Sequence, residues 1–99
     1  MTEERRSDER VSLNLPARWD GLSGTSEAKV EDLSLGGCFV NTRGQVTIGE
    51  LIGIEIKLPS GEWLALRGEV TAAQPGIGFG VVFPFLVDDE EQALRELIR

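Results

Sequence analysis

The stretch from Ile52 to Val70, IGIEIKLPSGEWLALRGEV, holds the clearest structural pattern in the chain. Up to Leu58, large apolar residues alternate with Gly, Glu and Lys, which is the period of a strand with one buried face. Pro59-Ser60-Gly61 is typical of a tight turn, and the residues from Trp63 onward can pair back as a second strand. The segment therefore predicts an antiparallel β-hairpin.

Short strand patterns also occur on both sides of this hairpin. They lie at Val11–Trp19, where Pro16 suggests an edge or a bend, and at Glu27–Ser34, Cys38–Val40 and Ile77–Phe83. Six or so short strands separated by turn residues predict a small antiparallel barrel or sandwich. We favour a barrel, because closure removes the exposed strand edges.

The C-terminal segment has a helical pattern instead. Asp88 can cap the helix, with Glu91 at the spacing of a capping box, and the acidic first turn suits the helix dipole. Leu94, Leu97 and Ile98 form one apolar stripe. A helix this short must bury that stripe to be stable, so we expect it to dock on one mouth of the barrel.

The N-terminal segment differs from the rest of the chain. Residues 1–10 contain four acids, three arginines and no large apolar residue after Met1, so we expect a mobile arm. The predicted organisation is a single domain with this arm at residues 1–10, a barrel at residues 11–87 and a helix at residues 88–99.

The composition excludes several classes of function. Ten Lys and Arg against seventeen Asp and Glu in 99 residues leave a net charge of −7, which argues against a general nucleic-acid binder. The chain contains no histidine, so Ser-His-Asp and Cys-His relays and histidine-containing zinc sites cannot form. We expect neither an enzyme nor a metal cofactor. A small anion could be bound only through a local cluster of arginines.

Cysteine usage and hydropathy indicate the compartment. Cys38 is the single cysteine, and its apolar neighbours predict a buried strand residue rather than a reactive thiol. The longest apolar run, Ile77–Val87, is far shorter than the roughly 20 residues needed to cross a bilayer. Residues 1–10 lack the apolar region of a signal peptide. We therefore expect a soluble, cytosolic protein.

Two short motifs carry the functional signal. The first, Arg5-Arg6-Ser7-Asp8-Glu9-Arg10, contains Arg-x-x-x-Arg, and the second, Asp32-Leu33-Ser34-Leu35-Gly36-Gly37, contains Asp-x-Ser-x-x-Gly. Taken alone, the first is typical of a solvated charged surface and the second of a turn that closes a hairpin. Their combination, with the first motif directly before a series of strands, is more specific than either.

This order of features resembles the PilZ family of bacterial receptor domains for cyclic di-GMP. The resemblance also includes the glycine-rich strand ending at Gly80-Val81-Val82-Phe83 and the C-terminal helix, and covers essentially the whole chain. It implies a six-stranded antiparallel barrel with the ligand held between arm and barrel. It further implies a non-enzymatic receptor of the bacterial cytoplasm that signals to a partner protein. The implied ligand-site residues are Arg5, Arg6, Arg10, Asp32, Ser34, Gly36 and Gly37.

The chemistry of these residues fits the ligand, which carries two phosphates and two guanines. The guanidinium of Arg6 or Arg10 can bind guanine O6 and N7, pair with phosphate or stack on a purine. An ionised Asp32 can accept the N1–H and N2–H of guanine, and Ser34 can bond to phosphate or to the loop backbone. The paired glycines after Ser34 allow close approach of the backbone to a ligand.

Some features keep two interpretations. Asp32 and Ser34 could serve only to close a turn, in a PilZ-like interaction module that acts without nucleotide. Gly76, Gly78 and Gly80 leave one face of a strand bare, either as room for a ligand or helix or for barrel curvature.

Arg5 bears on the stoichiometry. The resemblance implies that an arginine directly before Arg-x-x-x-Arg favours a stacked pair of cyclic di-GMP molecules, whose four phosphate charges a third guanidinium would offset. We therefore expect two ligands per chain, although Arg5 could also be an ordinary surface charge. Trp19 and Trp63 are expected to be core or barrel-rim aromatics.

Overall fold

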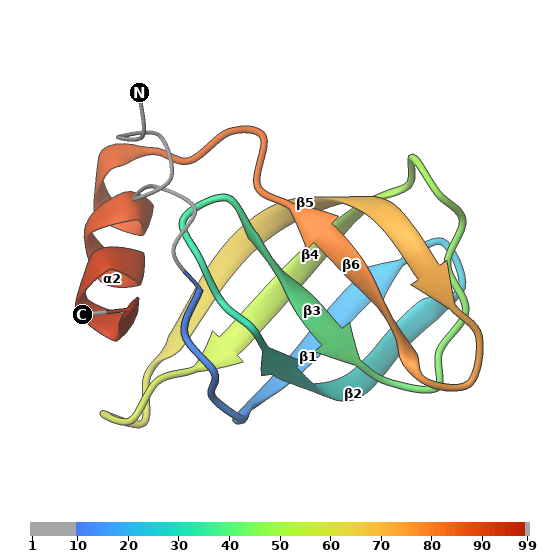
Figure 1. The fold of residues 1–99 in the computed structure, drawn as a ribbon, viewed down its shortest axis with the longest axis horizontal. Coiled ribbons are helices and arrows are strands. Elements are labelled where there is room, and N and C mark those ends of the chain that lie inside the picture. The colour runs from blue at the N-terminus through green and yellow to red at the C-terminus, as the bar shows by residue number, and fades with distance from the viewer. Residues whose placement is uncertain (1–9, 99) are drawn as a thin grey trace.

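The computed structural model describes residues 10–98 of the chain. Within this range, six antiparallel strands close into a barrel in the order β1-β2-β3-β6-β5-β4, and one helix lies at one end of it (Figure 1). The elements are β1 (Leu15–Gly21), β2 (Gly24–Glu31), β3 (Gly37–Asn41), β4 (Leu51–Lys57), β5 (Trp63–Gln74), β6 (Gly78–Val82) and α2 (Asp88–Ile98). The predicted fold class, an antiparallel six-stranded barrel followed by a C-terminal helix, is confirmed. Of the predicted arm, only Arg10 lies within the described residues.

Strand β1 closes the barrel because it pairs on both sides. Trp19 lies opposite Ser26 of β2 and opposite Ile54 of β4. Pro16 pairs with β2 alone, since the pairing with β4 begins at Ala17. The barrel therefore has no edge strand here, and the proline is tolerated beyond the end of the ladder that would need its N–H.

The strand boundaries near the two motifs differ from those predicted. β1 begins at Leu15 rather than Val11, and β2 ends at Glu31 rather than Ser34. The cause is Asp32, which has a φ of 52° and so leaves the extended conformation directly after β2. Val11 and Leu33 then pair as an isolated bridge outside the named strands.

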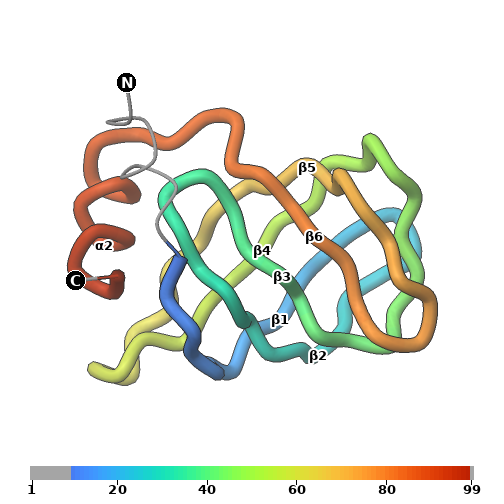
Figure 2. The backbone as a smooth tube through the Cα atoms, in the orientation of Figure 1, coloured from blue at the N-terminus to red at the C-terminus, as the bar shows by residue number. Residues whose placement is uncertain are grey.

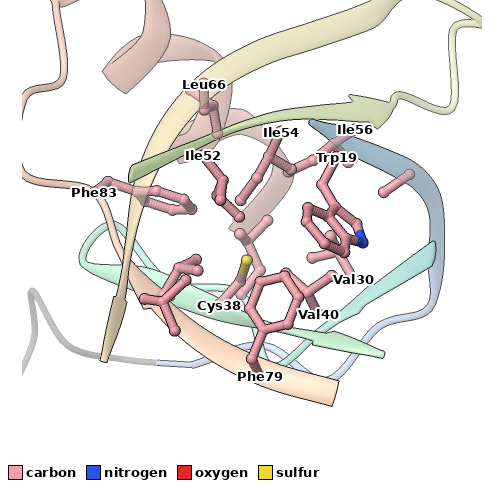
Figure 3. Close-up of a cluster of buried hydrophobic side chains, with 14 of the residues drawn as sticks. Trp19, Val30, Cys38, Val40, Ile52, Ile54, Ile56, Leu66, Phe79 and Phe83 are labelled. Carbon is pink, nitrogen blue, oxygen red and sulfur yellow. The ribbon is translucent and has the colours of Figure 1, made fainter. Parts of the chain in front are cut away.

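The core fills the barrel with the inward-facing residues of the strands. Its members include Trp19, Val30, Cys38, Val40, Ile52, Ile54, Ile56, Leu66, Phe79 and Phe83 (Figure 3). The Trp19 and Phe79 rings pack edge to face, with centroids 5.1 Å apart. Trp63, by contrast, is 39% exposed on the outer surface, with the Arg18 guanidinium 4.1 Å from its ring centroid. Of the two positions expected for the tryptophans, core or barrel rim, Trp19 lies in the core and Trp63 lies outside it.

Helix α2 lies at one end of the barrel (Figure 1) and buries its apolar stripe there, as predicted. Leu94 is fully buried, and Leu97 and Ile98 are partly buried against the core. The prediction that Asp88 is the N-cap is wrong by one residue. The first helical hydrogen bond runs from Glu91 N–H to the Val87 carbonyl. Val87 N–H in turn donates to the Glu90 carboxylate at 3.1 Å, so Val87 is the N-cap.

Candidate ligand-binding site

A backbone bridge joins the two sequence motifs. Val11 N–H donates to the Leu33 carbonyl at 2.9 Å, and Leu33 N–H donates to the Val11 carbonyl at 3.1 Å. In an antiparallel pair, the residue before one partner faces the residue after the other, so Arg10 lies opposite Ser34. Figure 2 shows the chain after residue 10 running alongside the segment that leads into β3. The bridge thus brings the last residue of the arginine motif to the Asp-x-Ser-x-x-Gly loop.

The Ser34 side chain organises this loop. Its Oγ accepts hydrogen bonds from Gly36 N–H at 3.1 Å and Gly37 N–H at 3.3 Å, and lies 3.3 Å from the Gly37 carbonyl, to which it can donate. Ser34 N–H also donates to that carbonyl at 2.9 Å. The side chain is buried, at 6% exposure. Of the two partners foreseen for the Ser34 hydroxyl, phosphate or loop backbone, the structure shows the backbone.

Asp32 is the only residue other than glycine with a positive φ among residues 10–98, at 52°. Aspartate tolerates this left-handed conformation better than most residues, but it is still uncommon. The consequence is that β2 ends at Glu31 and that the Asp32 side chain is exposed at the start of the loop. No hydrogen bond to its carboxylate is made from within residues 10–98, so the carboxylate is not used to brace the turn there.

A surface hollow of about 560 Å³ opens beside the loop, between β3, β5 and β6. It is lined by Arg10, Ser34, Gly36, Gly37, Cys38, Phe39, Thr71, Ala72, Gly80, Val81 and Val82. Four of the predicted site residues therefore meet at one hollow. Asp32 is not among the residues that line it, and Arg5 and Arg6 lie outside the described residues.

The charges around this hollow contrast with those of the whole chain. Although the net charge is −7, the described residues that line the hollow include one arginine and no acid. Burial raises the pKa of the Cys38 thiol to about 12, so this lining cysteine stays protonated at neutral pH and is not a nucleophile. No group of His, Cys, Asp and Glu side chains within residues 10–98 could hold a metal ion. The hollow thus suits an anion or a neutral ring rather than a cation.

The motifs did not indicate the floor of the hollow, formed by outward-facing residues of three strands. Phe39 of β3 pairs with Gly80 of β6, which pairs in turn with Ala72 of β5. An extra residue, Thr71, sits in a β-bulge beside them. The only sequence signal for this floor was the repeat of glycines at every second position, which includes Gly80.

The geometry defines a small closed β-barrel domain with a loop-bounded hollow on its outer surface. The chain belongs to the PilZ domain family, whose model matches residues 4–99. PilZ domains are binding and regulatory modules. No helix among residues 10–98 is long and apolar enough to cross a membrane.

Solved structures support the fold assignment. The PilZ domain of CeSA from a cellulose-synthesizing bacterium is 22% identical, over 90% of this chain and 93% of that one, with a TM-score of 0.69. The Bacillus subtilis inhibitor of motility, MotI/DgrA, is 16% identical over 95% of this chain, with a TM-score of 0.75. This chain spans 49% of the length of MotI/DgrA. No curated protein matches the sequence.

Proposed function

We propose that this chain is a receptor module that binds cyclic di-GMP and passes the signal to a partner protein in the bacterial cytoplasm. The Val11–Leu33 bridge is the observation that carries the proposal, because it holds Arg10 opposite Ser34 at the edge of the hollow. Membership of the PilZ family supports the same conclusion, since such domains are generally receptors for this nucleotide.

Each group at the site has a proposed role in binding. The Arg10 guanidinium binds a phosphate or a guanine edge by charge-assisted hydrogen bonds. The Asp32 carboxylate accepts the N1–H and N2–H of a guanine. Ser34 acts by shaping the loop, and the small residues Gly36 and Gly37 let the ligand approach the backbone.

The proposal includes the rest of the arginine motif. Arg5 and Arg6 close over the bound nucleotide together with Arg10, and this ordering creates the surface that a partner protein reads. With Arg5 as a third guanidinium, two stacked cyclic di-GMP molecules bind per chain at saturation.

Isothermal titration with cyclic di-GMP tests the proposal, with GTP and cyclic di-AMP as controls. We expect saturable heat with cyclic di-GMP, a ratio near two ligands per chain, and no saturable heat with either control. An Arg5→Ala variant should lower the ratio toward one. Absence of saturable heat with cyclic di-GMP at micromolar protein would overturn the receptor proposal.

One observation favours a second candidate function. Because the Ser34 hydroxyl already makes hydrogen bonds within its own loop, the Asp-x-Ser-x-x-Gly motif would also suit a PilZ-like interaction module that acts without nucleotide. In that case Arg10 and Asp32 would be surface charges, and no titration with nucleotide would give saturable heat.

A further inference from the structure

The absence of a side chain at position 80 is not explained by packing. Gly80 lies on the outer face of β6, between Phe39 of β3 and Ala72 of β5. A Cβ built there would have the Ala72 Cβ and the Thr71 Oγ1 as its nearest neighbours, both 3.9 Å away. Its φ is not positive, unlike that of Gly76 in the preceding turn. A larger residue therefore fits the strand at this position, although glycine weakens a strand interior.

Gly78, two residues earlier on the same face, shows the opposite situation. A Cβ there would lie 2.1 Å from the Val40 carbonyl oxygen and 2.9 Å from the nearest atom of the Phe39 ring. The Phe39 side chain thus leans over Gly78, and no side chain of residues 10–98 covers Gly80, its own pairing partner. Gly78 is required by packing, whereas the open space above Gly80 belongs to the hollow.

The surface around Gly80 combines groups that suit the binding of a planar ring. Ala72 and Gly80 provide a floor without large side chains, and Phe39 adds an aromatic wall. Arg10 and the backbone of the Ser34 loop line the same hollow and can bind the polar edge of a ring or an attached phosphate. Apolar ring contacts combined with a few polar groups are typical of sites for nucleobases.

We infer that Gly80 is a specificity-determining residue: its missing side chain leaves the floor on which one purine base of the nucleotide packs. This inference rests on the proposed function and adds to it the surface that takes the base. The base lies over Gly80 and Ala72 with its edge toward Arg10. A side chain at position 80 occupies the place of the base without disturbing the barrel.

The rival explanation for Gly80 is structural. Thr71 forms a bulge next to Gly80, and its Oγ1 lies 3.4 Å from the Gly80 carbonyl. A glycine could therefore serve to bend β6 at the bulge. The two explanations differ in what a side chain at position 80 does to stability.

Gly53 provides a matched control. It lies on the outer face of β4, between Asp20 and Arg67, and its φ is not positive. No atom of the described part of the chain lies within 4 Å of a Cβ built there. It does not line the hollow beside Ser34. Gly53→Val therefore adds the same side chain to an equally open strand position on another part of the barrel.

The test compares the wild type with Gly80→Ala, Gly80→Val and Gly53→Val by calorimetric titration with cyclic di-GMP and by thermal unfolding. We expect Gly80→Val to weaken binding at least about tenfold, with a smaller loss for Gly80→Ala, and Gly53→Val to bind within about twofold of the wild type. All variants should unfold within about 5 °C of the wild type.

The outcomes separate this inference from the proposed function. If the wild type does not bind cyclic di-GMP, both are overturned. If the wild type binds and Gly80→Val binds equally well, only the role of Gly80 is overturned. The role of Gly80 is also overturned if Gly80→Val alone lowers the Tm by much more than about 5 °C, because the glycine is then needed for the strand.

Discussion

The two ends of the barrel use their polar residues differently. At the end opposite α2, the loop after β3 is locked by hydrogen bonds among protein groups. Trp19 Nε1–H donates to the Thr42 hydroxyl at 3.2 Å, and that hydroxyl lies 3.1 Å from the Glu27 carbonyl. Gly44 N–H also donates to it, at 3.3 Å. A Cβ on Gly44 would lie 2.3 Å from the Trp19 ring, so the loop packs directly on the indole.

At the end where the two sequence motifs meet, hydrogen bonds among protein groups hold only the Ser34 loop itself. Ser34 is buried and bonded in the same way as Thr42, but Arg10 and Asp32 make no side-chain hydrogen bond or ion pair to other residues within 10–98. Buried polar groups with every partner supplied by the protein stabilise it. Arg10 lines the hollow, and Asp32, which does not line it, is exposed at the start of the loop beside it, so both charges are accessible to a ligand. Under the proposed function, the Thr42 end therefore serves stability and the Arg10 end serves binding.

The largest expected effect tests the binding end through Asp32. Asp32→Asn removes the carboxylate charge but keeps a side chain that tolerates positive φ, so stability should hardly change. Loss of a hydrogen bond to a charged group should weaken binding of cyclic di-GMP by about 1.5–3 kcal/mol. Calorimetric titration measures the change, and Asp20→Asn on β1 is the matched control. Equal binding by Asp32→Asn and the wild type would show that the Asp32 carboxylate does not bind the nucleotide.

Thr42→Val tests the opposite end. The substitution keeps the shape of the side chain but leaves the buried Trp19 Nε1–H without its acceptor, so the free energy of unfolding should fall by about 1–3 kcal/mol. Thr42→Ser keeps the hydroxyl and should cost much less. Urea unfolding measures both. Binding of cyclic di-GMP by folded Thr42→Val should equal that of the wild type; a parallel loss of binding would mean that the two ends are coupled.

The smallest effect concerns Glu50, which clamps two loops at the Thr42 end. Its carboxylate accepts hydrogen bonds from Leu22 N–H at 2.7 Å and Thr47 N–H at 2.9 Å, and these bonds lower its pKa below the ordinary value of 4.5. Because the pKa of Glu50 is lower in the folded protein, ionisation of this carboxylate stabilises the fold. This stabilisation is fully present above pH 4.5 and is lost as the pH falls through the pKa of Glu50 in the folded protein.

Glu50→Gln should therefore reduce the drop in Tm that the wild type shows on acidification below pH 4.5. The measurement is thermal unfolding at a series of pH values from neutral to acidic. Glu62→Gln, at an exposed acid on the turn between β4 and β5, is the control. Identical profiles of Tm against pH for Glu50→Gln and the wild type would show that the hydrogen bonds to the Glu50 carboxylate do not contribute to stability.

The strand pattern was predictable because alternation of apolar and polar residues follows directly from one buried face, as in β4. The end of β2 was not, because the left-handed conformation of Asp32 depends on the loop that follows it. The motif residues could be named from the sequence, but the Val11–Leu33 bridge that joins them is a contact between distant segments with no local signal. For the same reason, the partners of Ser34 and the open floor at Gly80 required the structure.

The most direct test of the central claim, that the arginine held by the Val11–Leu33 bridge binds the nucleotide, compares two arginines at opposite ends of the barrel. Arg10 lines the hollow beside Ser34, whereas Arg43 lines a hollow at the Thr42 end. Titration with cyclic di-GMP should show Arg10→Ala weakened by about 1.5–3 kcal/mol and Arg43→Ala unchanged, with both variants as stable as the wild type. If Arg10→Ala binds as tightly as Arg43→Ala and the wild type, the assignment of the binding end is contradicted.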